Sequence, residues 1–266
     1  MGEELGTHFS PDEVEWIVMG VAMMGFLNKM TDSLGIEIEQ GAVDDVAALI
    51  EPTGWSMGQH AWGGATKPET AASVPTDSLK TLAKAAGNAP GAIRLEKEWM
   101  QGLPKKPEDA RAFLLKNFGC DDTLLSRMNH TKPHQSLAAM LKQNLDADQS
   151  EIGIGRKTLA GLVFANHMEN DYLIKQSKQL ASFHGVDDDT LAAADSFLSG
   201  STSSELETRT EAALHLATKI ASSPTAIDDE TLATVNETLS SAEIVEIIVW
   251  VAVNQLQHRL SLFYQC

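Results

Sequence analysis

Early in the second half of the chain, the sequence from Arg156 to Gly185 reads RKTLAGLVFANHMENDYLIKQSKQLASFHG. Its apolar residues recur at the three- and four-residue spacing that forms one face of a helix. We expect a single long helix from about Gly155 to His184. Gly185 falls just past its end, where glycine often takes the left-handed conformation that closes a helix.

The same helical pattern extends over nearly the whole chain. Gly and Pro cluster between the periodic segments, and few runs show the period of two that a strand requires. Ser10–Glu13 and Ser240–Glu243 have the capping-box pattern and begin helices that reach about Leu34 and residue 263. Further helices are expected at 41–51, 76–86, 90–101, 107–118, 121–129, 133–145, 187–198, 205–222 and 228–238. The sequence therefore predicts an all-α fold.

The charge balance disfavours several classes of partner. Lys and Arg number 20 and Asp and Glu number 37 among 266 residues, so the net charge is −17. A general nucleic-acid binder needs a basic face against phosphate, and docking on anionic lipid needs the same. We therefore expect neither a nucleic acid nor a membrane as partner.

Cysteine usage and the N-terminal residues indicate the cellular compartment. Cys120 and Cys266 are too few for a disulfide scaffold or a four-thiolate zinc site. The acidic start lacks the apolar run of a signal peptide, and the longest apolar run, Ile17–Leu27, is too short to span a bilayer. These features predict a cytoplasmic protein.

The composition divides the chain into three predicted parts, residues 1–51, 52–75 and 76–266. The middle part is a glycine-rich loop that holds Trp55, His60 and Trp62. Such a loop either closes over a pocket or is pinned in place by its large rings.

A partial internal repeat relates the two ends of the chain. Residues 9–34 align with residues 239–264, and the matched pairs include Ser10 with Ser240, Glu13 with Glu243, and Lys29 with Arg259. The alignment indicates either a repeat or two buried helices with similar caps.

Three further stretches complete a recognisable succession: LETRTEAAL at 206–214, IDDETL at 227–232 and LSSAEIVEII at 239–248. Together with residues 156–185 they resemble the carboxymuconolactone decarboxylase and alkylhydroperoxidase-D-like superfamily. The resemblance covers roughly 135–266, with a weaker echo at 9–39. It implies an alkylhydroperoxidase-D-like helical bundle in which the N-terminal helix corresponds to the last helix of a preceding copy. It also implies a homo-oligomer, a trimer or a hexamer.

The chain departs from this family at the redox centre. Redox members carry Cys-x-x-Cys at the turn of the core hairpin, and the register places these cysteines on Asn170 and Leu173. The family's His falls on Ser177 and its upstream Glu on Thr158. Since Asn and Leu form no thiolate, the dithiol peroxidase mechanism is not expected here.

Polar side chains nevertheless gather where the resemblance places the site. His167 and Asp171, four residues apart on the expected helix, would face each other as an acid/base pair, and Tyr172 would add a proton donor. We expect these three to be catalytic, and Thr158, Asn170, Ser177 and Arg259 to bind substrate. The alternative is a half-exposed polar helix face.

Two of these expectations carry alternatives of their own. Arg259 follows His258 at the family's Asn-Arg position, where it would hold a substrate carboxylate or cap the end of its helix. His130 and His134 have the spacing of a metal pair, but Pro133 between them and the lack of a third ligand argue against a site. We expect no metal and no cofactor.

The leading functional hypothesis is a divergent member of the family that binds a small, possibly carboxylated molecule. If it is an enzyme, it would be a decarboxylase-like lyase that works by acid/base chemistry. A second hypothesis is a non-catalytic oligomeric or regulatory protein that kept the fold. A third is an antioxidant hydroperoxide reductase that uses Cys120 alone, although the adjacent Asp121 and Asp122 disfavour a thiolate there.

Overall fold

The computed structural model describes residues 2–36, 48–49, 51–53, 79–121, 124–198, 200, 206–222 and 225–266. Every regular element within these ranges is a helix, which confirms the all-α prediction. The chain forms two compact units, one of residues 1–34 with 102–266 and the other of residues 35–101. This grouping differs from the predicted division, because the N-terminal helix belongs to the same unit as the C-terminal helices.

The described residues of the unit 35–101 include the long helix α4 (Leu79–Trp99) and the short 3-10 helix η1 (Glu51–Thr53). The sequence predicted two helices here, at 76–86 and 90–101, but α4 is continuous through Pro90. Most of the predicted helix at 41–51 lies outside the described residues. So does most of the loop at 52–75, including Trp55, His60 and Trp62.

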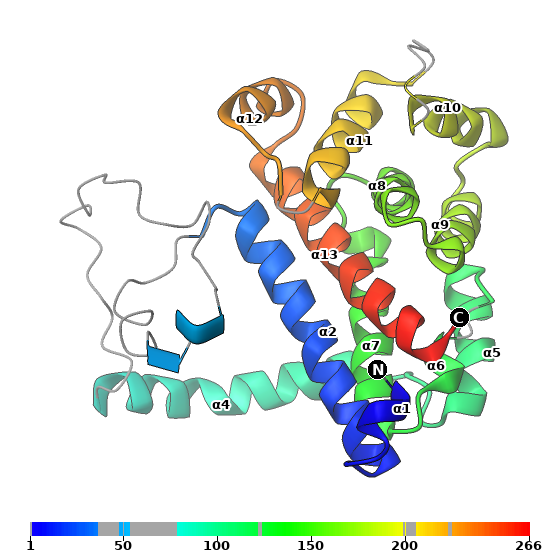
Figure 1. The fold of residues 1–266 in the computed structure, drawn as a ribbon. Coiled ribbons are helices and arrows are strands. Elements are labelled where there is room, and N and C mark those ends of the chain that lie inside the picture. The colour runs from blue at the N-terminus through cyan, green and yellow to red at the C-terminus, as the bar shows by residue number, and fades with distance from the viewer. Residues whose placement is uncertain are drawn as a thin grey trace. The chain divides into compact units, whose positions relative to one another are not determined.

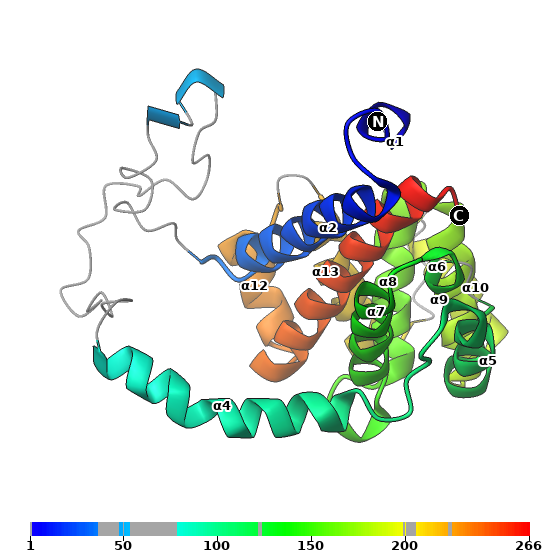
Figure 2. The same cartoon turned by 90° about the horizontal axis from the view of Figure 1, so that it is seen from below.

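The larger unit is built around α13 (Ser241–Tyr264). Figures 1 and 2 show α2 (Pro11–Ser33) beside α13 and antiparallel to it. The helices α8 (Ile154–His167) and α11 (Thr208–Ala221) also pack on α13. Its central residues, from Ile247 to Gln257, are nearly all buried, so one apolar helix supplies much of the core.

Shorter helices surround this centre. They are α1 (Gly2–Leu5), α5 (Pro107–Phe118), α6 (Leu124–Arg127), α7 (Thr131–Asn144), η3 (Ala147–Gln149), α9 (Asp171–Phe183), α10 (Asp188–Leu198) and α12 (Asp229–Asn236). Helix α5 has the predicted bounds, whereas the helix predicted at 121–129 is reduced to the four residues of α6. No helix in the described ranges combines the length and the apolar character needed to cross a bilayer.

Both predicted capping boxes are present. Ser10 and Ser240 each accept a hydrogen bond from the backbone N–H three residues later, and Glu13 and Glu243 each accept one from the backbone of that serine. These bonds satisfy N–H groups that a helix start leaves unpaired. The caps explain why the starts of α2 and α13 were predictable to the residue.

The matched basic residues of the predicted repeat have different contacts. Lys29 Nζ donates to the carbonyls of Ile220 and Ser222, 3.0 and 2.8 Å away, at the end of α11. A cation there interacts well with the negative end of the helix dipole. Arg259 instead crosses α2 beside Gly25, where a Cβ would come within 2.4 Å of its Nε.

The single long helix predicted for 155–184 is wrong, since α8 ends at His167 and α9 begins at Asp171. Glu169 closes α8 in the left-handed conformation, with φ +49°. The Asn170 and Glu169 N–H groups donate to the carbonyls of Ala165 and Asn166, each at 3.0 Å, in the pattern of a Schellman motif. The predicted stop at Gly185, with φ +83°, is confirmed.

Candidate functional site

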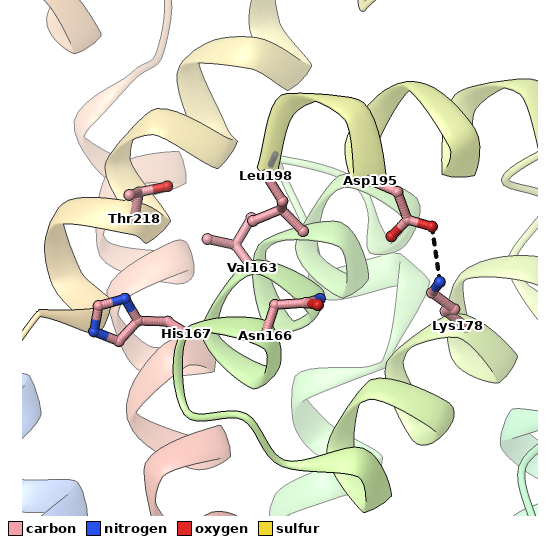
Figure 3. A pocket seen from close by; sticks show the side chains of 7 residues that line it. All are labelled: Val163, Asn166, His167, Lys178, Asp195, Leu198 and Thr218. Carbon is pink, nitrogen blue, oxygen red and sulfur yellow. Dashed lines mark hydrogen bonds and ion pairs between the residues drawn. The ribbon is translucent and has the colours of Figure 1, made fainter. Parts of the chain in front are cut away.

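A pocket of about 620 Å³ lies among α8, α9, α10 and α11 (Figure 3). The described residues that line it are Val163, Asn166, His167, Lys178, Asp195, Leu198 and Thr218. His167 is the residue of the predicted catalytic set that lines this pocket.

Helix α8 brings three lining residues to one face. Val163, Asn166 and His167 are spaced three and four residues apart, so they project from neighbouring turns. The Asn166 side-chain amide donates back to the Leu162 carbonyl at 2.9 Å, which fixes its orientation. Figure 3 shows the His167 ring on one side of Val163 and the Asn166 amide on the other.

A charged pair closes the other end of the pocket. Lys178 Nζ of α9 lies 2.8 Å from Asp195 Oδ2 of α10, and both side chains are partly exposed. Thr218 of α11 donates its hydroxyl proton to the Leu214 carbonyl at 2.9 Å, so its oxygen is left to accept. The pocket thus offers an imidazole, an ammonium group paired with a carboxylate, and neutral hydrogen-bonding groups around an apolar floor.

Asp171 and Tyr172 do not join His167. The turn at Met168–Asn170 separates them from α8, so the four-residue spacing no longer places His167 opposite Asp171. Asp171 is exposed in the first turn of α9. Tyr172 accepts a hydrogen bond from Gln176 Nε2 at 3.0 Å. The predicted acid/base pair depended on the long helix and is not formed.

Asn170 lies in a different cluster, between the start of α9 and α13. Its Oδ1 accepts from the Leu173 N–H at 3.0 Å and caps α9. That bond orients the amide so that Nδ2 lies 2.9 Å from both His258 Nδ1 and Ser261 Oγ. Nδ1 therefore acts as an acceptor, and we assign the ring proton to Nε2. Burial, and then the charge of Arg259, lower the pKa of His258.

The other predicted substrate-binding residues lie away from this pocket. Thr158 is fully buried and donates to the Gly155 carbonyl at 2.7 Å, and Ser177 is also buried. Arg259 Nη1 donates to the Val21 carbonyl of α2 at 3.5 Å. None of the three lines the pocket of His167.

The structure also bears on the candidate metal and thiol groups. Within the described ranges, no group of three or more His, Cys, Asp or Glu residues is arranged to hold a metal ion. His130 precedes α7, and His134 is buried in its first turns. Cys120 is only 2% exposed.

Lys178, Asp195 and Thr218 were missed by the sequence reasoning. Each is a single polar residue on an amphipathic helix, and such residues ordinarily face solvent. The chain carries no local motif that would distinguish them. Only the packing of α9, α10 and α11 around α8 brings them to His167.

Comparison with known proteins places the chain in no group. No family model matches it, and neither the curated proteins nor the solved structures searched contain a match. The resemblance to the carboxymuconolactone decarboxylase superfamily therefore stays a prediction.

Proposed function

We propose that this chain binds a small molecule with a carboxylate group in the pocket among α8, α9, α10 and α11. The observation that carries the proposal is the position of His167 and Lys178 at opposite ends of this pocket, on either side of Val163 and Leu198. A ligand with one anionic end and an apolar body matches that arrangement.

Lys178 is available to such a ligand although it pairs with Asp195. Its side chain is 41% exposed and that of Asp195 is 45% exposed. Pairs of this kind contribute only about 0–1 kcal/mol to stability. A ligand carboxylate can therefore share or replace Asp195 at little cost, and its charge-assisted bond to the ammonium group is stronger than a neutral one.

His167 supplies the chemistry if the chain is an enzyme. We propose a decarboxylase-like lyase by resemblance to the superfamily named above. In that reaction the substrate's C–C bond to its carboxylate breaks and carbon dioxide leaves. The electron pair passes along a conjugated substrate body to a carbon at the other end of the pocket, where His167 delivers a proton. Lys178 takes the role that the sequence predicted for Arg259.

The test measures binding of benzoate and of its uncharged counterpart benzamide by isothermal titration calorimetry. We expect Lys178→Ala to weaken benzoate binding about tenfold or more, the worth of one charge-assisted contact. His167→Ala should weaken it less, because the imidazole lies at the other end of the pocket. His215→Ala and Lys175→Ala are matched controls, since both residues are exposed and lie on α11 and α9. Equal binding of benzoate and benzamide, or equal losses in the controls, would contradict the proposal.

A second candidate function is assembly without catalysis, and a specific surface favours it. The outer face of α2 carries Trp16, Val21, Met24 and Leu27, with exposed fractions of 48, 53, 54 and 37%. Apolar side chains gathered on one helix face often mark an interface. We infer a homo-oligomer, a trimer or a hexamer by the family resemblance.

Light scattering coupled to size exclusion tests this second candidate. Val21→Glu and Met24→Glu should shift the chain towards monomer. If another subunit covers this face of α2, each substitution would bury a charge in the interface. Leu262→Glu, at an exposed apolar position on α13, is the control. A monomeric parent chain would reject assembly through this face.

The hypothesis of a peroxidase that uses one cysteine gains least support. A hydroperoxide must reach the thiol, and Cys120 is buried. If Cys120→Ser leaves hydroperoxide reduction unchanged, this hypothesis is excluded.

A further inference from the structure

A second pocket, of about 290 Å³, lies where the N-terminal residues meet the end of α13. The described residues that line it are Gly6, Phe9, Pro11, Val14, Glu15, Asn129, Phe263 and Tyr264. Most of this surface is apolar, and Glu15 is its charged residue. The pocket shares no lining residue with the pocket of His167.

The Glu15 carboxylate is held by hydrogen-bond donors. The side chain is 4% exposed. Its Oε1 accepts from Tyr264 Oη at 2.6 Å, the Asn129 N–H at 2.9 Å and the His130 N–H at 3.4 Å. Each of these neighbours donates, so Oε1 is occupied as a hydrogen-bond acceptor.

The two carboxylate oxygens are unequally used. From the described residues Oε2 accepts only the shared Asn129 N–H, at 3.3 Å, whereas Oε1 accepts three bonds. Among the described residues, no ion pair involves Glu15. A buried carboxylate without a counter-charge is an unusual arrangement, since burying an unpaired charge is costly.

Aromatic rings form the rest of the site. Phe9, Phe263 and Tyr264 line the pocket, and the last two rings meet edge to face with centroids 4.9 Å apart. Ring faces attract cations, and they also accept an alkyl chain. Burial, followed by the hydrogen bond and charge of Glu15, raises the pKa of Tyr264, so its hydroxyl keeps the proton that it donates.

We propose that this pocket binds a small primary alkylammonium ion, with the ammonium group on Glu15 Oε2 and the alkyl chain against the aromatic rings. The N–H groups of a primary ammonium supply the donors that Oε2 lacks, which a quaternary ammonium cannot do. The net charge of −17 favours approach of any cation. An anion would be repelled by Glu15.

Three probes test the proposal by calorimetry and by shifts of the Tyr264 ring resonances: n-butylammonium, the uncharged 1-butanol of matching shape, and tetramethylammonium. We expect saturable binding of n-butylammonium with one ion per chain. We expect 1-butanol and tetramethylammonium to bind about tenfold more weakly or worse, because one lacks the charge and the other the N–H donors. Equal binding of either one overturns the proposal.

Substitutions locate the site. Glu15→Gln removes the charge but keeps an acceptor for Tyr264, and it should weaken n-butylammonium binding about tenfold or more. Phe9→Leu keeps the apolar volume at a 42% exposed position, so it should fold normally, and loss of the ring face should weaken binding about threefold. Asp12→Asn removes a neighbouring exposed carboxylate that does not line the pocket.

The results that support the proposal differ from those that contradict it. The site is supported if Asp12→Asn weakens n-butylammonium binding less than twofold, while Glu15→Gln weakens it about tenfold and Phe9→Leu about threefold. Equal losses in all three variants would show attraction to the acidic surface in general and would overturn the proposal. Retained binding in the folded Phe9→Leu and Glu15→Gln variants would overturn it as well.

Discussion

Lys157 and Glu246 form a buried ion pair that holds three segments together. Lys157 Nζ also donates to the Asn144 carbonyl at 2.7 Å. Glu246 Oε2 accepts from the backbone N–H groups of Glu151 and Ile152 at 3.0 and 3.1 Å. Burial raises the pKa of Glu246, but these bonds and the lysine outweigh burial and leave the pKa below its usual value.

Removing one partner should therefore be costly. Glu246→Gln leaves the Lys157 ammonium buried without a counter-charge, and we expect the free energy of unfolding to fall by about 3–5 kcal/mol in urea titrations. The double variant Lys157→Met with Glu246→Gln leaves no charge buried and should recover part of that loss. A double variant that adds the two single losses would contradict this account.

His134 should make the fold sensitive to acid. The ring is fully buried, and neither nitrogen has a hydrogen-bond partner in the described part of the chain. Burial lowers the pKa, and the charges of Asp109 and Glu15 offset only part of this. The folded chain therefore keeps the neutral ring while the unfolded chain protonates. The contribution of the neutral His134 ring to stability is complete above the ordinary pKa of 6.5. It is lost as the pH falls from there through the lowered pKa of the folded chain.

Urea midpoints measured at about pH 7.5 and about pH 5 test this linkage. His134→Leu should lose less stability on acidification than the parent chain does. Part of the dependence of stability on pH should remain in this variant, because burial also lowers the pKa values of His184 and His258. The exposed His215→Leu is the control and should leave the slope unchanged. If His134→Leu loses as much stability on acidification as the parent chain, the His134 ring does not cause the acid sensitivity.

Two helix glycines should respond to alanine in opposite directions. On α8, a Cβ at Gly161 would lie 2.7 Å from Trp250 Nε1 and 3.2 Å from Asn254 Nδ2. Gly161→Ala should lower stability by about 1–3 kcal/mol, because the crossing with α13 is overpacked. On α2, no atom of the described residues lies within 4 Å of a Cβ at Gly20. Gly20→Ala should raise stability by about 0.5–1 kcal/mol through helix propensity alone.

Thermal unfolding of both variants gives the comparison. The two substitutions are chemically identical. If one lowers and the other raises the stability, the difference comes from the close approach of α8 to α13. Stabilisation by both substitutions would mean that Trp250 and Asn254 can move aside without loss.

The helices themselves were largely predictable because their ends carry local signals. Ser10 and Ser240 cap through their own side chains, and Gly185 ends α9 with the conformation that glycine favours. The break between α8 and α9 lacks such a signal, because Glu169 adopts the left-handed conformation that side chains usually avoid. Tertiary packing, rather than local preference, sets that turn.

The candidate site was less predictable than the fold. The sequence placed His167 inside one long helix, and its pairing with Asp171 followed from that helix, which the structure breaks after His167. Lys178 and Thr218 reach the pocket from two other helices, α9 and α11, and their positions depend on how those helices pack. A pattern read along one helix cannot supply contacts between helices, so the acidic and basic partners had to come from the structure.

At the scale of the whole molecule, the net charge of −17 should make stability depend on salt. Like charges repel more strongly in the compact state than in the unfolded chain. The screening length falls from about 10 Å at 0.1 M salt to about 3 Å at 1 M. We therefore expect the unfolding temperature to rise as sodium chloride is raised over this range. Potassium chloride should act equally, because screening depends on ionic strength rather than on the ion. A falling unfolding temperature would mean that favourable ion pairs such as Lys157–Glu246 outweigh the repulsion.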